Sequence, residues 1–267
     1  MILDLQHEQH QAADPHTGHD MGSMKPAAEA APPPVVTPRA ADRLFDPKAM
    51  AAARAQLMVE HGGGSFWTVR ADQLEYRSRK GADAQAFEGE AWWGTDAGKW
   101  VVKARGERID GEGWEKGEAE LLKAWPIGPY FDLQAGVRYD LAPPKLSKGG
   151  RSYAAVGFEG LAPYWFEVQG AAYLSDRGDV SARAEASYDL RLTQKLILQP
   201  RVEADLAEAG AATLEGGLRL RYEITREFAP YIGVTYLGQF GNTATYVSES
   251  GGQPDQLRFV AGMRAWF

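Results

Sequence analysis

The sequence predicts an all-β fold: an antiparallel up-and-down transmembrane β-barrel of about twelve strands, preceded by a disordered tail and one short helix. Three observations favour it. From Ser65 onward apolar and polar residues alternate with a period of two, no apolar run approaches the roughly 18 residues of a transmembrane helix, and the connections between the alternating segments are of two kinds. In such a barrel the apolar faces contact lipid and the charged faces line a lumen.

The chain begins with a segment that lacks any strand pattern. Residues 1–43 contain "PAAEAAPPPVVTPRAA", which is rich in Pro and Ala and has almost no large apolar side chains. Such a segment buries too little surface to offset the entropy lost on ordering, so we expect a disordered tail. The expected organisation is a tail, then a helix with a glycine linker that is a candidate plug, then the barrel, over residues 1–43, 44–64 and 65–267.

One helix is expected between the tail and the barrel. Asp46 fits an N-cap, Pro47 fits the first helical turn and Gly62 fits the stop, and the residues between them are rich in alanine. These signals predict a helix of about four turns over residues 47–60.

Twelve strands account for the rest of the chain. In "LRLRYEIT", for example, the apolar residues Leu218, Leu220 and Tyr222 share one face, and the charged residues between them share the other. The expected strands are 65–77, 86–94, 98–109, 113–124, 129–140, 151–161, 164–174, 179–191, 194–206, 213–225, 229–240 and 256–267.

The connections between these strands alternate in length. The turns "GTDAG", "AWPIGP", "LAP", "LTQ" and "REFAP" are short, whereas "SRKGADAQA", "APPKLSKGGR" and "GNTATYVSESGGQPD" are long and polar, with "IDGEG" and "SDRGD" as short exceptions on that side. Three short turns carry proline flanked by aromatic pairs: Trp125 and Tyr130, Tyr164 and Trp165, Phe228 and Tyr231. Short turns at one end, longer loops at the other and an aromatic girdle are typical of outer-membrane barrels. A soluble β-sandwich would explain the alternation, but not this asymmetry or the terminal Phe267.

With the apolar faces outward, the lumen receives charges of both signs. The acidic residues are Glu88, Glu90, Glu107, Glu118, Glu120, Asp132, Glu159, Glu167, Glu185, Glu203, Asp205, Glu215 and Glu223, and the basic residues are Arg70, Arg105, Arg138, Arg183, Arg201, Arg219, Arg221 and Arg264. One interpretation is cross-strand ion pairs that hold the wall rigid. The other is a narrow polar path whose acidic excess favours cations.

Candidate metal ligands are concentrated in the tail. Four of the five histidines lie there, beside two methionines: His7, His10, His16, His19, Met21 and Met24. Imidazole suits copper, zinc and nickel, and thioether sulfur selects soft Cu(I), so this composition predicts reversible copper capture. The alternative is a solvated polar tail without a ligand.

The expected helix carries a second candidate group. Met50, Leu57, Met58 and His61 lie near one face, and the spacing of three between Met58 and His61 would let them share one metal ion. The alternative is a stripe by which the helix packs.

Several classes of function are disfavoured. A net charge of −7 and the absence of a basic cluster argue against nucleic acid as a partner. The chain has no cysteine, and no histidine follows His61, so the strands lack the base that a serine nucleophile needs. There is no P-loop, dinucleotide-binding fingerprint or HExxH motif. We therefore expect a protein that is not an enzyme.

Several long stretches resemble the copper resistance protein B family. They are "EGEAWWG", "DLQAGVRYD", "AAVGFEGLAPYWFEV", "YDLRLTQKLILQPRVE", "LRLRYEITREFAPYIGV" and "FVAGMRAWF", and the resemblance covers roughly residues 65–267. The His/Met tail is similar to the variable metal-binding N-terminus of that family. The resemblance implies an outer-membrane barrel of Gram-negative bacteria that works with periplasmic copper-handling proteins in copper tolerance.

From these observations we expect a monomer in outer-membrane lipid, with its tail in the periplasm and copper, as Cu(I) or Cu(II), as the bound or transported ion. A periplasmic copper chaperone or multicopper oxidase is the expected protein partner. Two alternatives remain open: a non-conducting barrel that docks such an oxidase, and a general porin for small solutes.

Overall fold

The structure is a computed structural model in which the chain forms two compact units, Met1–Glu60 and His61–Phe267, each described here by itself. It describes residues 40–61, 64–78, 81–141, 150–207, 210–249 and 253–267. Most of the expected tail, residues 1–39, and the predicted helix stop at Gly62 lie outside these ranges. No helix in them is long and apolar enough to cross a membrane.

The N-terminal unit contains the predicted helix. A short 3-10 helix, η1 (Ala40–Arg43), is followed by α1 (Pro47–His61). The carboxylate of Asp46 accepts hydrogen bonds from the backbone N–H groups of Lys48 (3.4 Å) and Ala49 (3.0 Å), which confirms the N-cap. The boundaries of the helix agree with the sequence prediction to within one residue.

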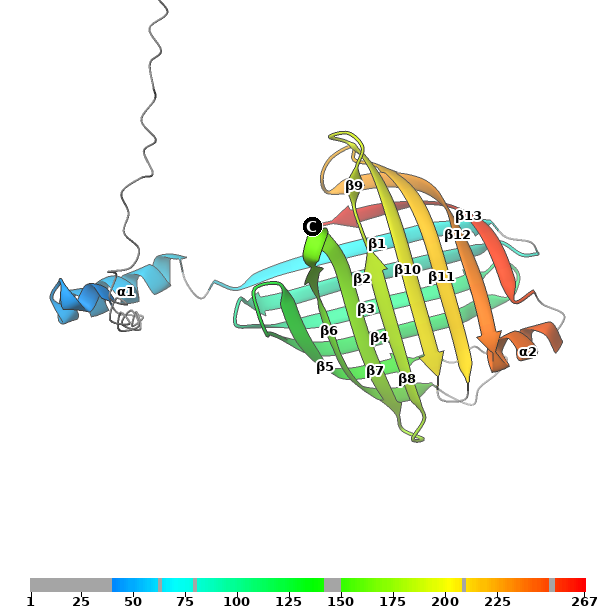
Figure 1. Ribbon diagram of the computed structural model, residues 1–267, viewed down its shortest axis with the longest axis horizontal. Helices are drawn as coiled ribbons and strands as arrows, with labels where there is room; N and C mark the ends of the chain where they lie inside the picture. Colours follow the sequence, from blue (N-terminus) through cyan, green and yellow to red (C-terminus); the bar gives the residue numbers. More distant parts are fainter. Residues whose placement is uncertain (1–39, 62–63, 79–80, 142–149, 208–209, 250–252) are drawn as a thin grey trace, which may run out of the picture. The chain divides into compact units, whose positions relative to one another are not determined.

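The second unit is a closed antiparallel barrel (Figure 1). In the described residues it has thirteen strands: β1 (Phe66–Ser78), β2 (Ala84–Thr95), β3 (Gly98–Ile109), β4 (Gly113–Pro126), β5 (Phe131–Asp140), β6 (Arg151–Ala162), β7 (Phe166–Ser175), β8 (Val180–Ser187), β9 (Leu190–Arg191), β10 (Leu196–Ala207), β11 (Ala211–Tyr222), β12 (Phe228–Gly241) and β13 (Asp255–Trp266). Because β8 and β9 both pair with β10, one after the other, the wall is that of a 12-stranded barrel, as predicted.

The last strand closes the barrel on the first. Strand β13 pairs with β1, and beyond its end Phe267 exchanges backbone hydrogen bonds with Val69, at 2.8 and 3.0 Å. An open sheet would leave unpaired backbone N–H and C=O groups along its two edges, and closure pairs them. In lipid this pairing is required, because no water is present to bond those groups.

Two segments differ from the sequence prediction. The strand expected over 179–191 is broken after Ser187, where Tyr188 N–H donates to the carbonyl of Pro200 (3.1 Å). The reciprocal bond is missing because proline has no N–H. The long connection after β12, expected as a loop, contains the helix α2 (Asn242–Glu249), which at eight residues is too short for a helical period to stand out in the sequence.

The inside-out arrangement is confirmed. In β11, Leu218 and Tyr222 are each 48% exposed on the outer surface, whereas Arg219 is 3% and Arg221 4% exposed. A soluble sheet would show the reverse. The charged faces therefore line the lumen, and the apolar faces form the surface that meets lipid.

The two ends of the barrel have different connections. At one end, which we call the short-turn end, short turns join β2–β3, β4–β5, β6–β7, β9–β10 and β11–β12. The opposite end carries the other connections and α2, and we call it the long-loop end. At the short-turn end Trp67, Trp93 and Trp100 lie side by side on neighbouring strands and are exposed. They belong to the aromatic girdle that the turns predicted, together with Trp125, Tyr130, Tyr164, Trp165 and Phe228.

Tyr231 is the exception to the expected girdle. It is buried inside the barrel, and its hydroxyl donates to Glu75 (3.1 Å). Its neighbour Ile232 faces outward, as does Phe228, three residues before Tyr231. The expectation followed nearness to proline, whereas the period of two decides the direction.

Candidate functional site

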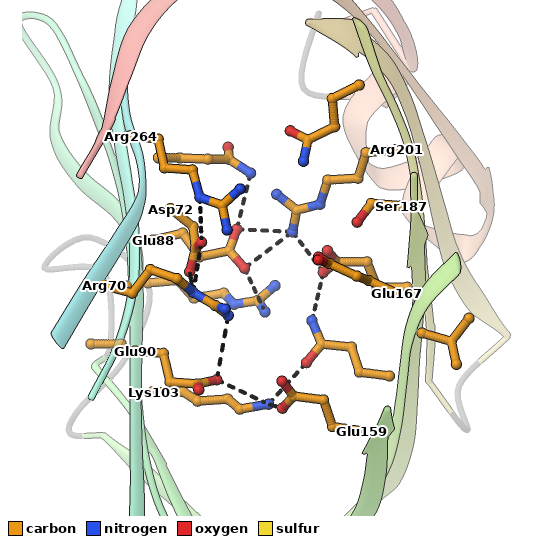
Figure 2. Close-up of a pocket in the computed structure, with 18 of the residues that line it drawn as sticks. Arg70, Asp72, Glu88, Glu90, Lys103, Glu159, Glu167, Ser187, Arg201 and Arg264 are labelled. Carbon is orange, nitrogen blue, oxygen red and sulfur yellow. Dashed lines mark hydrogen bonds and ion pairs between the residues drawn. The ribbon is translucent and has the colours of Figure 1, made fainter. Parts of the chain in front are cut away.

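The lumen is crossed by ion pairs between strands that are not neighbours in the wall. Arg105 on β3 contacts Glu203 on β10 (3.1 Å), and Arg201 on β10 contacts Glu88 on β2 (2.8 Å). Figure 2 shows Glu88 and Arg201 pointing toward one another from opposite sides. We call these four residues the Arg201 level. Ion pairs between neighbouring strands, such as Arg105–Glu88 (3.3 Å) and Arg201–Glu185 (2.6 Å), are present as the first interpretation of the lumen charges expected, and the structure adds pairs that cross the interior.

Glu118 is a buried carboxylate of the lumen with three arginine partners. Its side chain is 2% exposed and lies 3.0 Å from Arg105 Nε and 2.9 Å from Arg183 Nη1, with Arg138 as a third partner. The guanidinium of Arg138 lies 4.6 Å from the centre of the Tyr173 ring. The ion pairs between these three arginines and one buried carboxylate connect β3, β4, β5 and β8.

Glu75 forms a comparable cluster elsewhere in the lumen, between β1, β11 and β12. Its fully buried carboxylate accepts from Arg77 Nε (2.7 Å), Arg219 Nε (2.8 Å) and the hydroxyl of Tyr231. Neither Glu75 nor Arg77 was expected in the lumen, although both share a face with other inward residues of β1. Counting in steps of two from the predicted lumen residue Arg70 puts both on the outer face, and only the irregular pairing after Ala71, which shifts the alternation by one residue, turns them inward.

A second crossing lies nearer the short-turn end. Lys103 Nζ on β3 contacts Glu159 Oε2 on β6 (2.6 Å) and Gln169 Oε1 on β7 (2.9 Å), and Glu90 Oε2 on β2 is 3.7 Å away. We call these four residues the Lys103 level. Lys103 was also missed, yet it stands two residues from the predicted lumen residue Arg105.

Cavities lie between and beyond these crossings. One of about 290 Å³ is lined by residues of both levels, including Glu88, Arg201, Glu90 and Lys103 (Figure 2). A larger one, of about 1040 Å³, opens toward the long-loop end, and a third, of about 510 Å³, lies at the short-turn end. The lumen is thus a series of chambers separated by charged side chains.

Part of the interior is apolar, which the sequence reading did not anticipate. Val101, Leu122, Ala124, Ala155 and Tyr173 form a buried cluster, with Trp92, Tyr153 and Ala171 packed against it. These residues project inward from β2, β3, β4, β6 and β7. We call this cluster the apolar side of the lumen and the charged side chains that cross the interior its charged side, although both include residues of β3 and β4.

The metal ligands predicted from the sequence stay predictions. The six tail residues His7, His10, His16, His19, Met21 and Met24 lie outside the described residues. On α1, Met50 is half-buried and Met58 is exposed, and His61 is the last residue of the helix. Within the described ranges no group of three or more His, Asp or Glu side chains is arranged to hold a metal ion.

The donor atoms available for a metal differ between residues 1–61 and the rest of the chain. After His61 the chain has no histidine, and its one methionine, Met263, is exposed on the outer face of β13. The lumen therefore offers carboxylate, amide and hydroxyl oxygens and cationic side chains. The soft sulfur and imidazole donors suited to copper are, apart from Met263, confined to residues 1–61.

Comparisons with known proteins identify relatives of this chain. The family model described as "Copper resistance protein B precursor (CopB)" matches residues 65–267. Copper resistance protein B of Escherichia coli is 38% identical over 277 residues, covering 96% of this chain and 91% of that protein. The copper resistance protein B homolog of Pseudomonas syringae pv. tomato is 36% identical over 233 residues, covering 81% of this chain and 77% of the homolog.

The solved structures that match this chain include porins with low sequence identity to it. The NanC porin is 15% identical, with a TM-score of 0.49, and the match covers 75% of this chain and 99% of the porin. The KdgM porin is 9% identical, with a TM-score of 0.47 and the same coverage.

Proposed function

The chain belongs to the copper resistance protein B family, and on that premise we propose that it binds copper through residues 1–61 on the periplasmic side and aids copper efflux or sequestration. It is an outer-membrane β-barrel involved in copper resistance. Our proposal adds the ligands, the side of the membrane and the division of work between the two units.

The observation that carries the proposal is the distribution of donors. All five histidines and five of the six methionines lie in residues 1–61, and the sixth methionine faces away from the lumen. Thioether sulfur selects Cu(I) and imidazole suits Cu(II), so the tail with Met50, Met58 and His61 can take copper in either oxidation state. A lumen of oxygen donors and paired charges has no comparable preference for copper.

In this proposal the tail gathers copper and the lumen offers a narrow polar path. The chain encodes no energy source, so movement is passive or is driven by a soluble periplasmic partner that delivers copper. The crossings at the Arg201 and Lys103 levels divide this path into chambers, and the alternative of a general porin for small solutes predicts conduction of ordinary ions without a preference for copper.

Those same crossings favour a second candidate. A barrel whose lumen is tied from wall to wall also suits a non-conducting anchor that docks a periplasmic multicopper oxidase. In that case copper bound by residues 1–61 would pass to the oxidase and not through the lumen.

Copper binding by the purified full chain in detergent tests the proposal. We expect stoichiometric binding of Cu(I) or Cu(II) that is lost when residues 1–43 are removed and Met58 and His61 are replaced. The control is Met263→Leu, which removes the one thioether of the barrel and should leave binding unchanged. Unchanged binding in the truncated protein would show that the proposed ligands are wrong.

Copper flux from loaded liposomes separates the two candidates. Release through the full chain supports a path through the lumen. Tight liposomes, together with binding of a multicopper oxidase, support the anchor.

A further inference from the structure

The Arg201 and Lys103 levels close the lumen in different ways. At the Arg201 level the guanidinium of Arg201 contacts three carboxylates, those of Glu88, Glu185 and Glu203, at 2.8, 2.6 and 2.9 Å. Arg105 contacts Glu88 and Glu203 as well. Two rigid guanidinium groups thus share carboxylates, so no single side chain holds this level.

The Lys103 level depends on one ammonium group. Glu159 Oε2 lies 2.6 Å, Gln169 Oε1 2.9 Å and Glu90 Oε2 3.7 Å from Lys103 Nζ. These oxygens come from β6, β7 and β2, so they surround the ammonium from different strands (Figure 2). Lysine carries a compact charge on a flexible stem and can leave such a position by rotating its side chain.

The positions of the acceptors are set by other residues. Gln134 Nε2 donates to Glu159 (3.0 Å), and Gln169 Nε2 donates to Glu185 (2.8 Å), so that the carbonyl oxygen of Gln169 is turned toward Lys103. Arg70 lies 3.9 Å from Glu90. The oxygens would therefore stay near their places if Lys103 moved away, because their orientation does not depend on it alone.

We propose that the Lys103 level is a cation-binding site that the protein fills with its own ammonium group, and that takes a small divalent cation when Lys103 is displaced. The ammonium group of Lys103, a cation held by three oxygen atoms, marks the position of this site. Carboxylate and amide oxygens around a positive charge are the ligands of hard divalent cations such as Mn²⁺, Mg²⁺ and Ca²⁺. Lys103 repels any second cation at this position, so it decides whether cations enter the chamber beyond it.

The site also controls access between chambers. Glu159 lines both the cavity at the short-turn end and the central cavity, so the Lys103 level separates the two. A cation arriving from the short-turn end meets this level before the Arg201 level. The inference does not rest on copper as the cargo, because the oxygen ligands of the site are independent of residues 1–61.

Binding of Mn²⁺ to the full chain in detergent, followed by electron paramagnetic resonance, tests the inference. Lys103→Met should bind one Mn²⁺ more than the unsubstituted protein, and Lys103→Arg, which keeps the charge, should bind none in addition. The matched control is Lys99→Met, because Lys99 lies on the same strand and pairs with Asp132 (2.8 Å) at the short-turn mouth, outside the Lys103 level. The double variant Lys103→Met/Glu159→Gln removes a ligand and should lose the added Mn²⁺.

Folding is checked by the heat-modifiable gel mobility of each variant, and Lys103→Gln serves with the same criteria if Lys103→Met does not fold. The inference is overturned if neither substitution binds more Mn²⁺ than the unsubstituted protein, or if the double variant retains the added ion. In planar bilayers with KCl, Lys103→Met should raise the ratio of K⁺ to Cl⁻ permeability about thirtyfold, because one unit charge at about 4 Å in water changes the permeability of each ion about fivefold and in opposite directions. An unchanged ratio would also contradict it, and neither failure would bear on copper binding by the tail.

Discussion

The charged and the apolar sides of the lumen fill the same barrel by different means. Short side chains such as Val101, Ala124 and Ala155 pack close to the wall from which they project, whereas arginine and glutamate reach across to strands on the far side. Backbone ladders join only neighbouring strands. The charged side therefore supplies the connections between distant strands, and the apolar side supplies packing.

The two sides of the lumen should differ in whether they contribute to the stability of the barrel alone or also to its ion selectivity. Removing an apolar side chain leaves a cavity beside the wall, while removing a charge leaves its partners unpaired in the path of an ion. The first change should lower stability alone, and the second should change both stability and ion preference. Four substitutions test this division.

The largest effect is expected at the centre of the charged side. Glu118→Gln leaves the guanidinium groups of Arg105, Arg138 and Arg183 without their shared carboxylate. Breaking such a buried network should lower the free energy of unfolding by about 4 kcal/mol. Urea unfolding of the refolded barrel in micelles measures this, and a change below the effect of Leu122→Ala would refute the ranking.

A smaller loss is expected on the apolar side. Leu122→Ala removes a buried side chain from the cluster and should cost about 3 kcal/mol through the cavity that it leaves. Leu121→Ala is the control, because Leu121 is adjacent in β4 but faces outward. The ratio of K⁺ to Cl⁻ permeability should not change, and a shift in it would break the distinction between the two sides.

Tyr173 belongs to both sides and sharpens the comparison. Its ring packs in the apolar cluster, and its hydroxyl donates to Glu120 Oε1 (2.9 Å). Tyr173→Phe keeps the ring and removes the donor, so the expected loss is about 1–2 kcal/mol in the same unfolding measurement. A loss as large as that of Leu122→Ala would mean that the hydroxyl, and not the packing, dominates at this position.

The smallest effect is expected where a charge pair does not cross the lumen. Arg191 and Glu223 form a pair 3.1 Å apart at the short-turn end, with the arginine side chain 57% exposed. Arg191→Gln should change the free energy of unfolding by less than about 0.5 kcal/mol, because water screens such a pair. If Arg191→Gln lowered the free energy of unfolding nearly as much as Glu118→Gln, the strength of the lumen ion pairs would not depend on their crossing the interior.

Much of the fold was accessible from the sequence because a strand repeats every two residues. The alternation located twelve wall positions and predicted their inside-out orientation, as Leu218 and Arg219 illustrate. The cap at Asp46 predicted the start of α1. The same period would have placed Lys103 and Tyr231 in the lumen had it been applied to every residue, but not Glu75, because the irregular pairing after Ala71 shifts the alternation of β1 by one residue.

Other features depend on the three-dimensional arrangement. Strand parity says whether a side chain points inward, but not which distant residue it meets. Arg105 and Glu203 are 98 residues apart, and Arg219 and Glu75 are 144 apart. Their contacts arise only when β13 closes on β1 and fixes the tilt and register of opposite walls.

The sequence by itself determined the period, the direction of each face, the two kinds of connection and the confinement of soft metal donors to the N-terminal segment, because each of these depends on local order along the chain. Closure of the barrel decided which charges pair across the lumen, which side is filled by apolar residues and which oxygens surround Lys103. Local rules do not reach that far, since side chains from opposite walls become neighbours only when the whole sheet has curved into a cylinder.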